Sequence, residues 1–147
     1  MENYSDLIKL NAPADKVFDA LTNEIPLWWT EMFEGSANNK NDAFTVRFGE
    51  TIYKTILVKE ITNNLKIVWS VTDSLINIPE LKNQTEWIGT SIEWEIIPQG
   101  SKTELLLTHI GLRPDIECYD ICTTGWKQFT NSLKLFVETG KGNPFKQ

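Results

Sequence analysis

The feature of this sequence that most constrains its fold is a long amphipathic helix near the C-terminus. Apolar side chains recur there at intervals of three and four, so they form one stripe over about five helical turns. The stripe consists of Tyr119, Cys122, Trp126, Phe129, Leu133 and Phe136. Gly140 stands where a glycine commonly ends a helix, and Pro144 prevents it from resuming. We predict a helix over residues 115–139 whose apolar face must be buried.

Alternating apolar and polar residues, the pattern of half-buried β-strands, precede this helix. Strands are expected at residues 4–10, 44–48, 51–61, 65–72, 90–97 and 103–111. The later strands are separated by turn-sized gaps, which indicates an antiparallel meander. In the strand 65–72 the predicted inward residues begin with Leu65. For the strand 51–61 the pattern does not decide which face points inward, because both faces carry aliphatic residues.

Two short helices are expected near the N-terminus. Pro13 suits a first helical turn, and apolar residues then recur with helical spacing as far as Leu21. A second short helix is expected from about Asn23, carrying Trp28 and Trp29, followed by a flexible rim at 31–35 and a polar loop at 35–43. A longer connection is expected at 73–85.

A curved antiparallel sheet cannot close its own concave face, so the C-terminal helix is expected to lie along it. The sequence therefore predicts a single α+β domain over residues 1–147 with a helix-grip architecture. About six strands would wrap around the long helix, with the two short helices near the N-terminus.

Charge and composition exclude several classes of protein. A net charge of −6 without any Lys/Arg cluster argues against nucleic acid and against an anionic membrane as partners. No apolar run approaches the ~20 residues of a membrane span, and the acidic, alternating N-terminus differs from a signal peptide. Cys118 and Cys122, four residues apart, fit a reduced protein. We expect a cytoplasmic location.

Four stretches of the sequence are familiar: LNAPADKVFDALT, PLWWT, EWIGTSIEWEIIPQGSKTELLLTHIGL and TGWKQFTNSLKLFVETGKGNP. They resemble the Hsp90 ATPase activator homologue family, of the C-terminal-domain type, within the SRPBCC superfamily. The resemblance implies the Bet-v-1-like, START-like fold. That superfamily includes lipid and sterol carriers, hormone receptors, polyketide cyclases and aromatases, and one domain of a eukaryotic co-chaperone.

Aromatic side chains dominate the predicted inward faces, where they would either fill a core or line a cavity for an apolar ligand. The residues expected to line such a cavity are Trp28, Trp29, Phe33, Phe48, Trp69, Trp94, Leu107, His109, Cys122, Gly125, Trp126 and Phe129.

Two details bear on whether the space is filled or open. Successive helical residues are rotated by about 100°, so one of Trp28 and Trp29 is expected in the core and the other at the cavity mouth or in solvent. Burial of both against different elements is the alternative. Gly125 costs a helix roughly 1 kcal/mol relative to alanine. Either the sheet approaches closely there, or the helix leaves room for a ligand.

No set of residues forms a convincing catalytic centre. His109, the only histidine, is expected to be a buried structural residue bonded to backbone or a tyrosine, and Cys118, Cys122 and His109 lack a fourth zinc ligand. We expect no metal and no cofactor. The leading hypothesis is non-enzymatic binding of a small hydrophobic molecule, lipid-like or aromatic and polyketide-like. The alternatives are a co-chaperone-like module that acts on an Hsp90-type chaperone, and a cyclase or aromatase type of enzyme.

Overall fold

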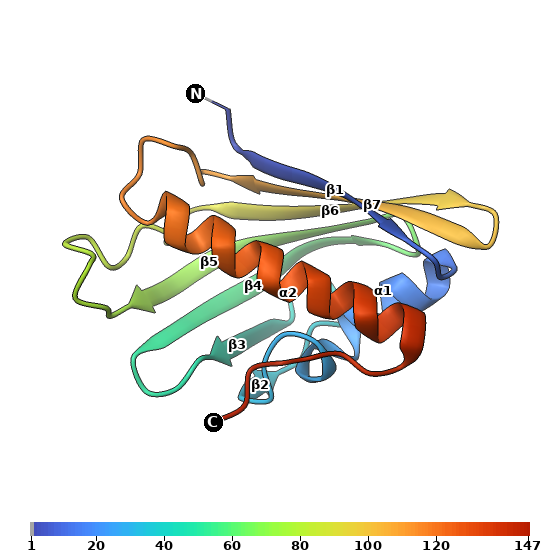
Figure 1. Cartoon of the computed structure of the whole chain (residues 1–147), viewed down its shortest axis with the longest axis horizontal. Coiled ribbons are helices and arrows are strands. Elements are labelled where there is room, and N and C mark those ends of the chain that lie inside the picture. Colours follow the sequence, from blue (N-terminus) through green and yellow to red (C-terminus); the bar gives the residue numbers. More distant parts are fainter. Residues whose placement is uncertain (1) are drawn as a thin grey trace.

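A computed structural model describes residues 2–147 as one curved antiparallel sheet with a long helix across its concave face (Figure 1). The strands are β1 (Tyr4–Leu10), β2 (Phe33–Gly35), β3 (Ala43–Arg47), β4 (Ile52–Thr62), β5 (Lys66–Ile76), β6 (Ser91–Gln99) and β7 (Lys102–Ile110). The helices are α1 (Ala14–Thr22), the single 3₁₀ turn η1 (Ile25–Leu27) and α2 (Tyr119–Thr139). The predicted helix-grip fold is confirmed.

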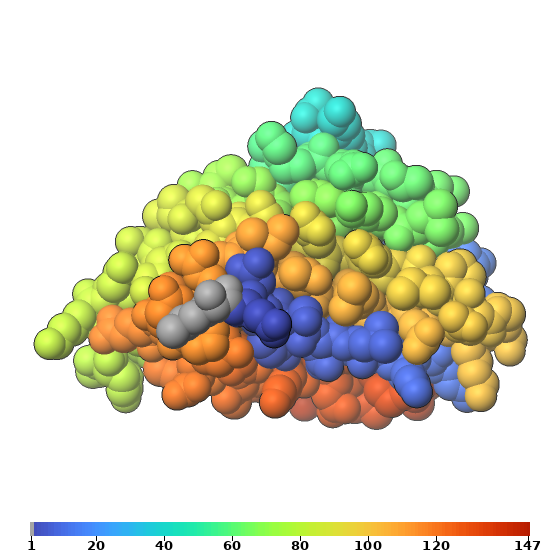
Figure 2. Space-filling model, turned by 90° about the horizontal axis from the view of Figure 1, so that it is seen from above, coloured from blue at the N-terminus to red at the C-terminus, as the bar shows by residue number. Residues whose placement is uncertain are grey.

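The seven strands lie in the order β1-β7-β6-β5-β4-β3-β2, with every neighbouring pair antiparallel. Seen from above, β1 lies between β7 and helix α2 (Figure 2). In β4 the register shifts between Thr55 and Ile56 and again between Val58 and Glu60. Such bulges bend a strand and increase its twist, which helps to curve the sheet around α2.

The N-terminal prediction of two short helices is half right. Helix α1 forms, but the second helix is only the turn η1, because the backbone leaves helical geometry at Trp28 (φ −134°). The segment expected as a flexible rim forms the edge strand β2, which raises the strand count from about six to seven. Gly35 ends β2 with φ +101°, where a Cβ would overlap the carbonyl of Ala43.

Two further boundaries differ from the prediction. Strand β5 continues to Ile76, so the connection to β6 begins at residue 77 instead of 73 and runs to residue 90. Leu65 is half exposed instead of inward-facing, because it belongs to the turn in which Asn64 adopts a positive φ and strand β5 begins only at Lys66.

Helix α2 begins at Tyr119 rather than at residue 115 and ends at Gly140, which has the left-handed conformation of a C-cap. The backbone N–H groups of Glu117 and Cys118 donate to the two carboxylate oxygens of Glu86, at 3.1 and 3.0 Å. These bonds hold the residues just before the helix in a non-helical turn.

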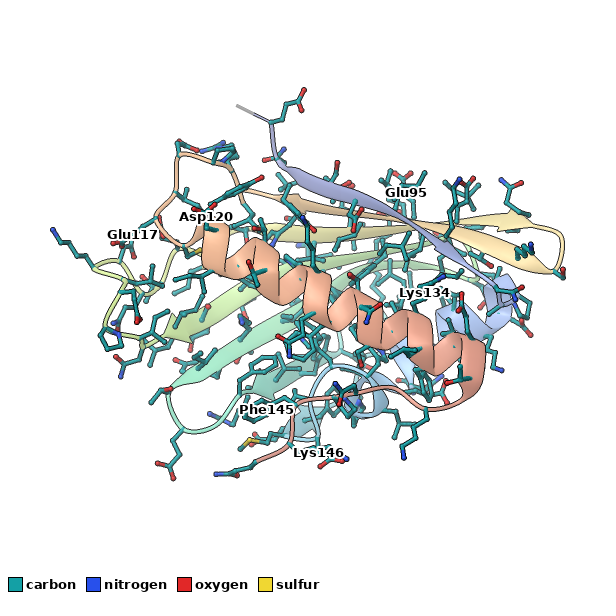
Figure 3. All side chains as sticks on the ribbon, in the orientation of Figure 1. Glu95, Glu117, Asp120, Lys134, Phe145 and Lys146 are labelled. Atoms are coloured by element: carbon teal, nitrogen blue, oxygen red, sulfur yellow. The ribbon has the colours of Figure 1, made fainter. Side chains whose placement is uncertain are left out.

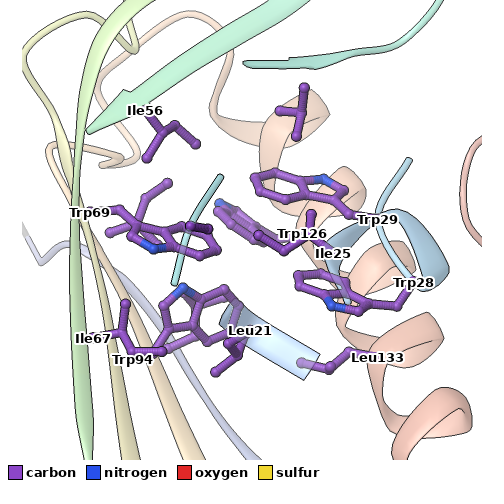
Figure 4. Close-up of a cluster of buried hydrophobic side chains, with 14 of the residues drawn as sticks. Leu21, Ile25, Trp28, Trp29, Ile56, Ile67, Trp69, Trp94, Trp126 and Leu133 are labelled. Carbon is purple, nitrogen blue, oxygen red and sulfur yellow. The ribbon is translucent and has the colours of Figure 1, made fainter. Parts of the chain in front are cut away.

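The core lies between the sheet and α2, and its centre is a group of stacked indoles (Figure 4). Trp28 and Trp29 are both buried and stack on each other, with centroids 5.6 Å apart and planes 5° apart. Trp29 also stacks on Trp69 at 5.9 Å and on Trp126 at 5.5 Å. Of the two arrangements expected, the one with both indoles buried is found, and the two rings also stack on each other. The backbone leaves helical geometry at Trp28 (φ −134°, ψ −27°), so the rotation of about 100° between successive helical residues does not apply.

Candidate functional site

One end of the space between sheet and helix is not filled, and we call this cavity of about 240 Å³ the helix–sheet pocket. It is lined by Trp29, Phe48, Ile52, Lys54, Ile76, Trp87, Ile121, Cys122, Gly125, Trp126, Gln128, Phe129 and Phe145. Ile121 and Gln128 are exposed and form its mouth on α2, whereas Trp29, Trp87 and Trp126 are buried and form its inner walls.

The structure brings half of the sequence-predicted cavity residues to this pocket and places the others elsewhere. Those that line it are Trp29, Phe48, Cys122, Gly125, Trp126 and Phe129. Trp28, Trp69, Trp94, Leu107 and His109 are instead packed in the core, and Phe33 stacks on Phe44 near the sheet edge. Strand alternation indicated the correct face, but it carries no information about which part of that face is filled.

Gly125 lies on the pocket side of α2. A Cβ added there would meet no heavy atom within 4 Å outside the helix's own nearby backbone. The sheet therefore does not approach the helix closely at this position, and the missing side chain leaves space in the pocket.

Lys54 lines the pocket, although the sequence left the inward face of its strand unassigned. It alternates with Ile56 and Val58 on the inward face of β4 and is only 9% exposed. Its Nζ lies 4.4 Å from the centroid of the Trp87 ring and 4.7 Å from that of Phe48. Both contacts are cation–π interactions, which partly replace the hydration of an ammonium group. Burial lowers the pKa of Lys54 to about 8.

Among residues 2–147, no carboxylate pairs with the ammonium group of Lys54. The ion pairs among residues 2–147 join Arg47 to Glu34, Arg113 to Asp115 and Lys134 to Glu138, and all of them involve more exposed lysines or arginines. The nearby ionisable groups that affect Lys54 are the thiols of Cys122 and Cys118. A buried lysine without a carboxylate partner is rare in folded proteins.

Cys122 lies in the first turns of α2, beside Lys54 of β4, and is buried. The indole N–H of Trp87 donates to its Sγ at 3.2 Å. A hydrogen bond from the thiol of Cys118 lowers the pKa of Cys122. Burial acts in the opposite direction, whereas the charge of Lys54 and the hydrogen bond from Trp87 lower this pKa further. The same bond, together with burial, raises the pKa of Cys118. Cys122 is thus the thiol of the pair with the greater thiolate character.

Trp87 comes from the loop between β5 and β6, and two carboxylates fix this loop to the start of α2. Glu86 accepts the hydrogen bonds from the turn before α2, and Glu117 in that turn accepts from the backbone N–H groups of Lys82 and Asn83, both at 2.8 Å. Figure 3 shows Glu117 at this end of the helix. The reciprocal bonds hold the ring of Trp87 against Cys122 and Lys54.

Phe145 reaches the pocket from the C-terminal tail (Figure 3). Its backbone N–H donates to the carbonyl of Trp29 at 2.9 Å, and its own carbonyl accepts from Glu31 at 3.0 Å. The ring then packs edge-on against Phe48. A segment that follows the last helix thereby closes one side of the pocket.

His109 lies behind the pocket and is fully buried, as expected, but its partners differ from those expected. The indole N–H of Trp126 donates to Nδ1 at 3.0 Å, and Nε2 lies 2.9 Å from Thr90 Oγ1, which itself donates to the carbonyl of Trp87. Nε2 therefore carries the proton and donates to Thr90. Burial, and then the charge of Lys54, lowers the pKa of His109 to about 3. The imidazole is neutral and orients Trp126.

The structure offers two other observations that bear on function. Within residues 2–147, no three His, Cys, Asp or Glu side chains gather as a metal site would require. None of the helices in this part of the chain is long and apolar enough to cross a membrane.

Comparisons with known proteins agree with this architecture. The family described as "Activator of Hsp90 ATPase homolog 1-like protein" matches residues 11–138. Among solved structures, that of the Aha1 dimer from Colwellia psychrerythraea is 26% identical in sequence, with a TM-score of 0.77. The match covers 97% of this chain and 100% of that one.

Two further structures are similar at lower identity. DynU16, from the dynemicin biosynthetic locus, is 18% identical with a TM-score of 0.70, over 97% of this chain and 49% of that one. CalU16 from Micromonospora echinospora is 17% identical with a TM-score of 0.66, over 95% of this chain and 75% of that one. At such identities the likeness concerns the fold alone. No curated protein matches the chain.

Proposed function

The chain belongs to the family of Activator of Hsp90 ATPase homolog 1-like proteins, and from this premise we propose that it binds a small hydrophobic molecule in the helix–sheet pocket. The observation that carries the proposal is the pocket itself, whose walls are mainly aromatic and aliphatic and whose volume is about 240 Å³. Concave, mostly apolar sites with few polar groups are the usual form of small-molecule sites.

The size of the pocket narrows the ligand. A cavity of about 150 Å³ lined by aliphatic and aromatic side chains binds benzene. The helix–sheet pocket, at about 240 Å³, suits a ligand of one or two fused rings, or a short acyl chain. A sterol is too large unless the mouth at Ile121 and Gln128 opens further.

We propose a binding role rather than a catalytic one, because both nitrogens of His109 are already engaged in hydrogen bonds and its ring is uncharged. A cyclase-type reaction would have to use Lys54 or Cys122 instead. Any turnover that is found can be assigned by a variant carrying both Lys54→Met and Cys122→Ser. The free, buried thiols of Cys118 and Cys122 favour a reducing compartment, and we propose a cytoplasmic location.

The test is a titration of the uniformly ¹⁵N-labelled protein with naphthalene-sized compounds, followed by NMR. Binding in the pocket is expected to shift the amide resonances of Cys122 and Gly125 while leaving those of the outward residues Lys66 and Glu93 unchanged. A cholesterol analogue serves as the oversized control. Shifts confined to outward residues, or no binding by any compound, would refute the proposal.

A second candidate function is contact with an Hsp90-type chaperone. It is favoured by the family description and by the 26% identity to Aha1 of Colwellia psychrerythraea. The purified protein, at tens of micromolar, would then stimulate the ATPase of the chaperone from the same host. Stimulation that survives Gly125→Leu would separate this function from ligand binding, and an unchanged ATPase rate would remove the candidate.

A further inference from the structure

We propose that the ligand of the helix–sheet pocket carries one carboxylate, which binds the ammonium group of Lys54, while its apolar body lies against the aromatic walls. This inference rests on the proposed function, because it names the class of molecule that the same pocket takes. Its basis is Lys54, which lines the pocket, together with Ser74, which lies opposite Lys54 on β5 and just outside the pocket lining.

The first observation is the isolation of Lys54. It is the one charged residue among the described residues that line the pocket, and it is nine-tenths buried. Its Nζ faces the rings of Phe48 and Trp87 and has neither an ion pair nor a hydrogen bond within residues 2–147. An ammonium group removed from water is strongly destabilised unless an anion or several acceptors replace the water.

The second observation is independent of the first and concerns Ser74. In the register of β4 and β5, Ser74 lies directly opposite Lys54, so their side chains share the inward face of the sheet. Ser74 Oγ is buried and has no hydrogen-bond partner within the described residues. Buried hydroxyls are nearly always bonded. Two neighbouring polar groups without partners therefore mark an incomplete polar corner.

Other buried donors without partners do not weaken this reading. The hydroxyl of Tyr4, on the edge strand β1, and the indole N–H groups of Trp69 and Trp94 also have no partner within residues 2–147. Tyr4 does not line the pocket, and the two indole rings meet edge to face at 5.6 Å. In that arrangement an aromatic face can accept a weak N–H bond. Ser74 and Lys54 differ because their partners are oxygen or charge, and the pocket supplies neither.

The chemistry of the corner selects a monovalent carboxylate. One ammonium neutralises one negative charge, and a charge-assisted bond to a carboxylate is short and strong. A phosphate or sulfate group would bring three or four oxygens into a space whose remaining walls are apolar, so most of its acceptors would stay unbonded. An ammonium-bearing ligand would face like charge at Lys54.

Cys122 is the alternative partner that the test must exclude. Its Sγ faces the same space, and its pKa is lowered by the bond from Cys118 and also by Lys54. If a Cys122 thiolate already neutralised Lys54, the pocket would show no preference for acids. Cys122→Ser removes that possibility and keeps the size of the side chain.

The experiment measures dissociation constants at pH 7 for three probes with the same ring system: 2-naphthoate, 2-naphthamide and 2-naphthylmethylamine. We expect 2-naphthoate to bind roughly tenfold or more tightly than the amide, because only the acid makes a charge-assisted bond in a desolvated site. The protonated amine is expected to bind worst. In Lys54→Met the advantage of the acid over the amide disappears while the amide still binds.

Two matched variants serve as controls. Lys59→Met removes the same charge from the exposed side of the same strand and is expected to leave the preference unchanged. Cys122→Ser is also expected to keep it. Equal affinity for acid and amide in the wild type, or a preference that survives Lys54→Met, would overturn the carboxylate assignment and leave the proposed function standing. Absence of binding by all three probes and by naphthalene would overturn both.

Discussion

Two buried bases, His109 and Lys54, lie in the space between the sheet and α2, and they differ in whether their polar atoms have hydrogen-bond partners. Both ring nitrogens of His109 have partners, one from Trp126 and one at Thr90. Lys54 has aromatic faces around its ammonium and no acceptor for its protons within the described residues. The hydrogen-bonding positions of His109 are thus filled by neighbouring side chains, whereas those of Lys54 are not filled within residues 2–147. Four measurements test this difference between the two residues.

The largest effect is expected at the satisfied base. His109→Leu fills a similar volume but leaves the indole N–H of Trp126 without its acceptor, and it removes the hydrogen bond to Thr90, which still donates to the carbonyl of Trp87. The unsatisfied N–H costs about 1–3 kcal/mol and the lost bond about 1 kcal/mol, so the free energy of unfolding should fall by roughly 2–4 kcal/mol. Urea denaturation at pH 7 measures this change. A loss below about 1 kcal/mol would mean that the network around His109 is not structural.

Substitution of Lys54, in contrast, is expected to raise the free energy of unfolding. The pKa of Lys54 is about 8 in the folded chain against 10.5 for an ordinary lysine, so folding disfavours the charged form below pH 8. Lys54→Met should therefore raise the free energy of unfolding by about 2 kcal/mol at pH 7, after the lost cation–π contacts are allowed for. Denaturation in urea at pH 7 and pH 10 gives the comparison.

The pH dependence separates this cause from a packing effect. Between pH 8 and 10.5 the unfolded chain holds the lysine proton more tightly than the folded chain, so the stability that Lys54 removes returns as the pH rises. The ionisable groups that face Lys54 are Cys118, Cys122 and His109. The comparison of lysine with methionine at position 54 is therefore repeated in a protein that carries Cys122→Ser. The gap between wild type and Lys54→Met should narrow toward pH 10. Lys59→Met should change stability by less than about 0.5 kcal/mol at either pH. A less stable Lys54→Met variant would instead indicate a structural ion pair.

The third effect is the acid response of the wild type. His109 has a folded pKa of about 3, against 6.5 for a free histidine, so the unfolded chain binds a proton below pH 6.5 that the folded chain refuses. Stability is complete above pH 6.5 and falls as the pH is lowered toward 3. At pH 5 the loss should be about 2 kcal/mol. His109 is the only histidine, so unfolding measured between pH 7 and 5 reports mainly on this residue. A flat profile over that range would show that His109 is protonated in the folded protein.

The same two residues show which inward-facing side chains could be predicted from the sequence. Alternation along β7 placed His109 inward because Leu105 and Leu107 share its face, whereas Glu104 and Thr108 lie on the opposite face. Alternation failed for Lys54 because both faces of β4 carry aliphatic side chains and two bulges interrupt its register. Which face of such a strand is inward depends on tertiary packing, which a local pattern does not contain.

The other wall residues were missed for a different reason. Trp87 belongs to a loop with no periodicity, and its position depends on the bonds between that loop, Glu86 and Glu117. Phe145 is brought to the pocket by a parallel bridge between the tail and Thr30. Both are long-range arrangements. By contrast, the stripe of α2 and its C-cap glycine are local features, and they could be predicted because helical spacing alone determines which residues share a face.

The smallest effect on stability is expected at Gly125, and it tests whether the pocket is empty space. Gly125→Leu removes a glycine from the middle of α2, which is worth up to ~1 kcal/mol of helix propensity, and its Cβ meets nothing within 4 Å. The leucine side chain would extend into the pocket and gain some apolar burial. The melting temperature should therefore stay the same or rise by a few degrees, while the affinity for 2-naphthoate falls. Thr124→Leu, at the adjacent exposed position outside the pocket, is the control for leucine on this helix. A lower melting temperature with unchanged affinity would mean that leucine overpacks a closed contact, which typically costs 1–3 kcal/mol. Such a result would show that the region around Lys54 is packed as closely as the region around His109.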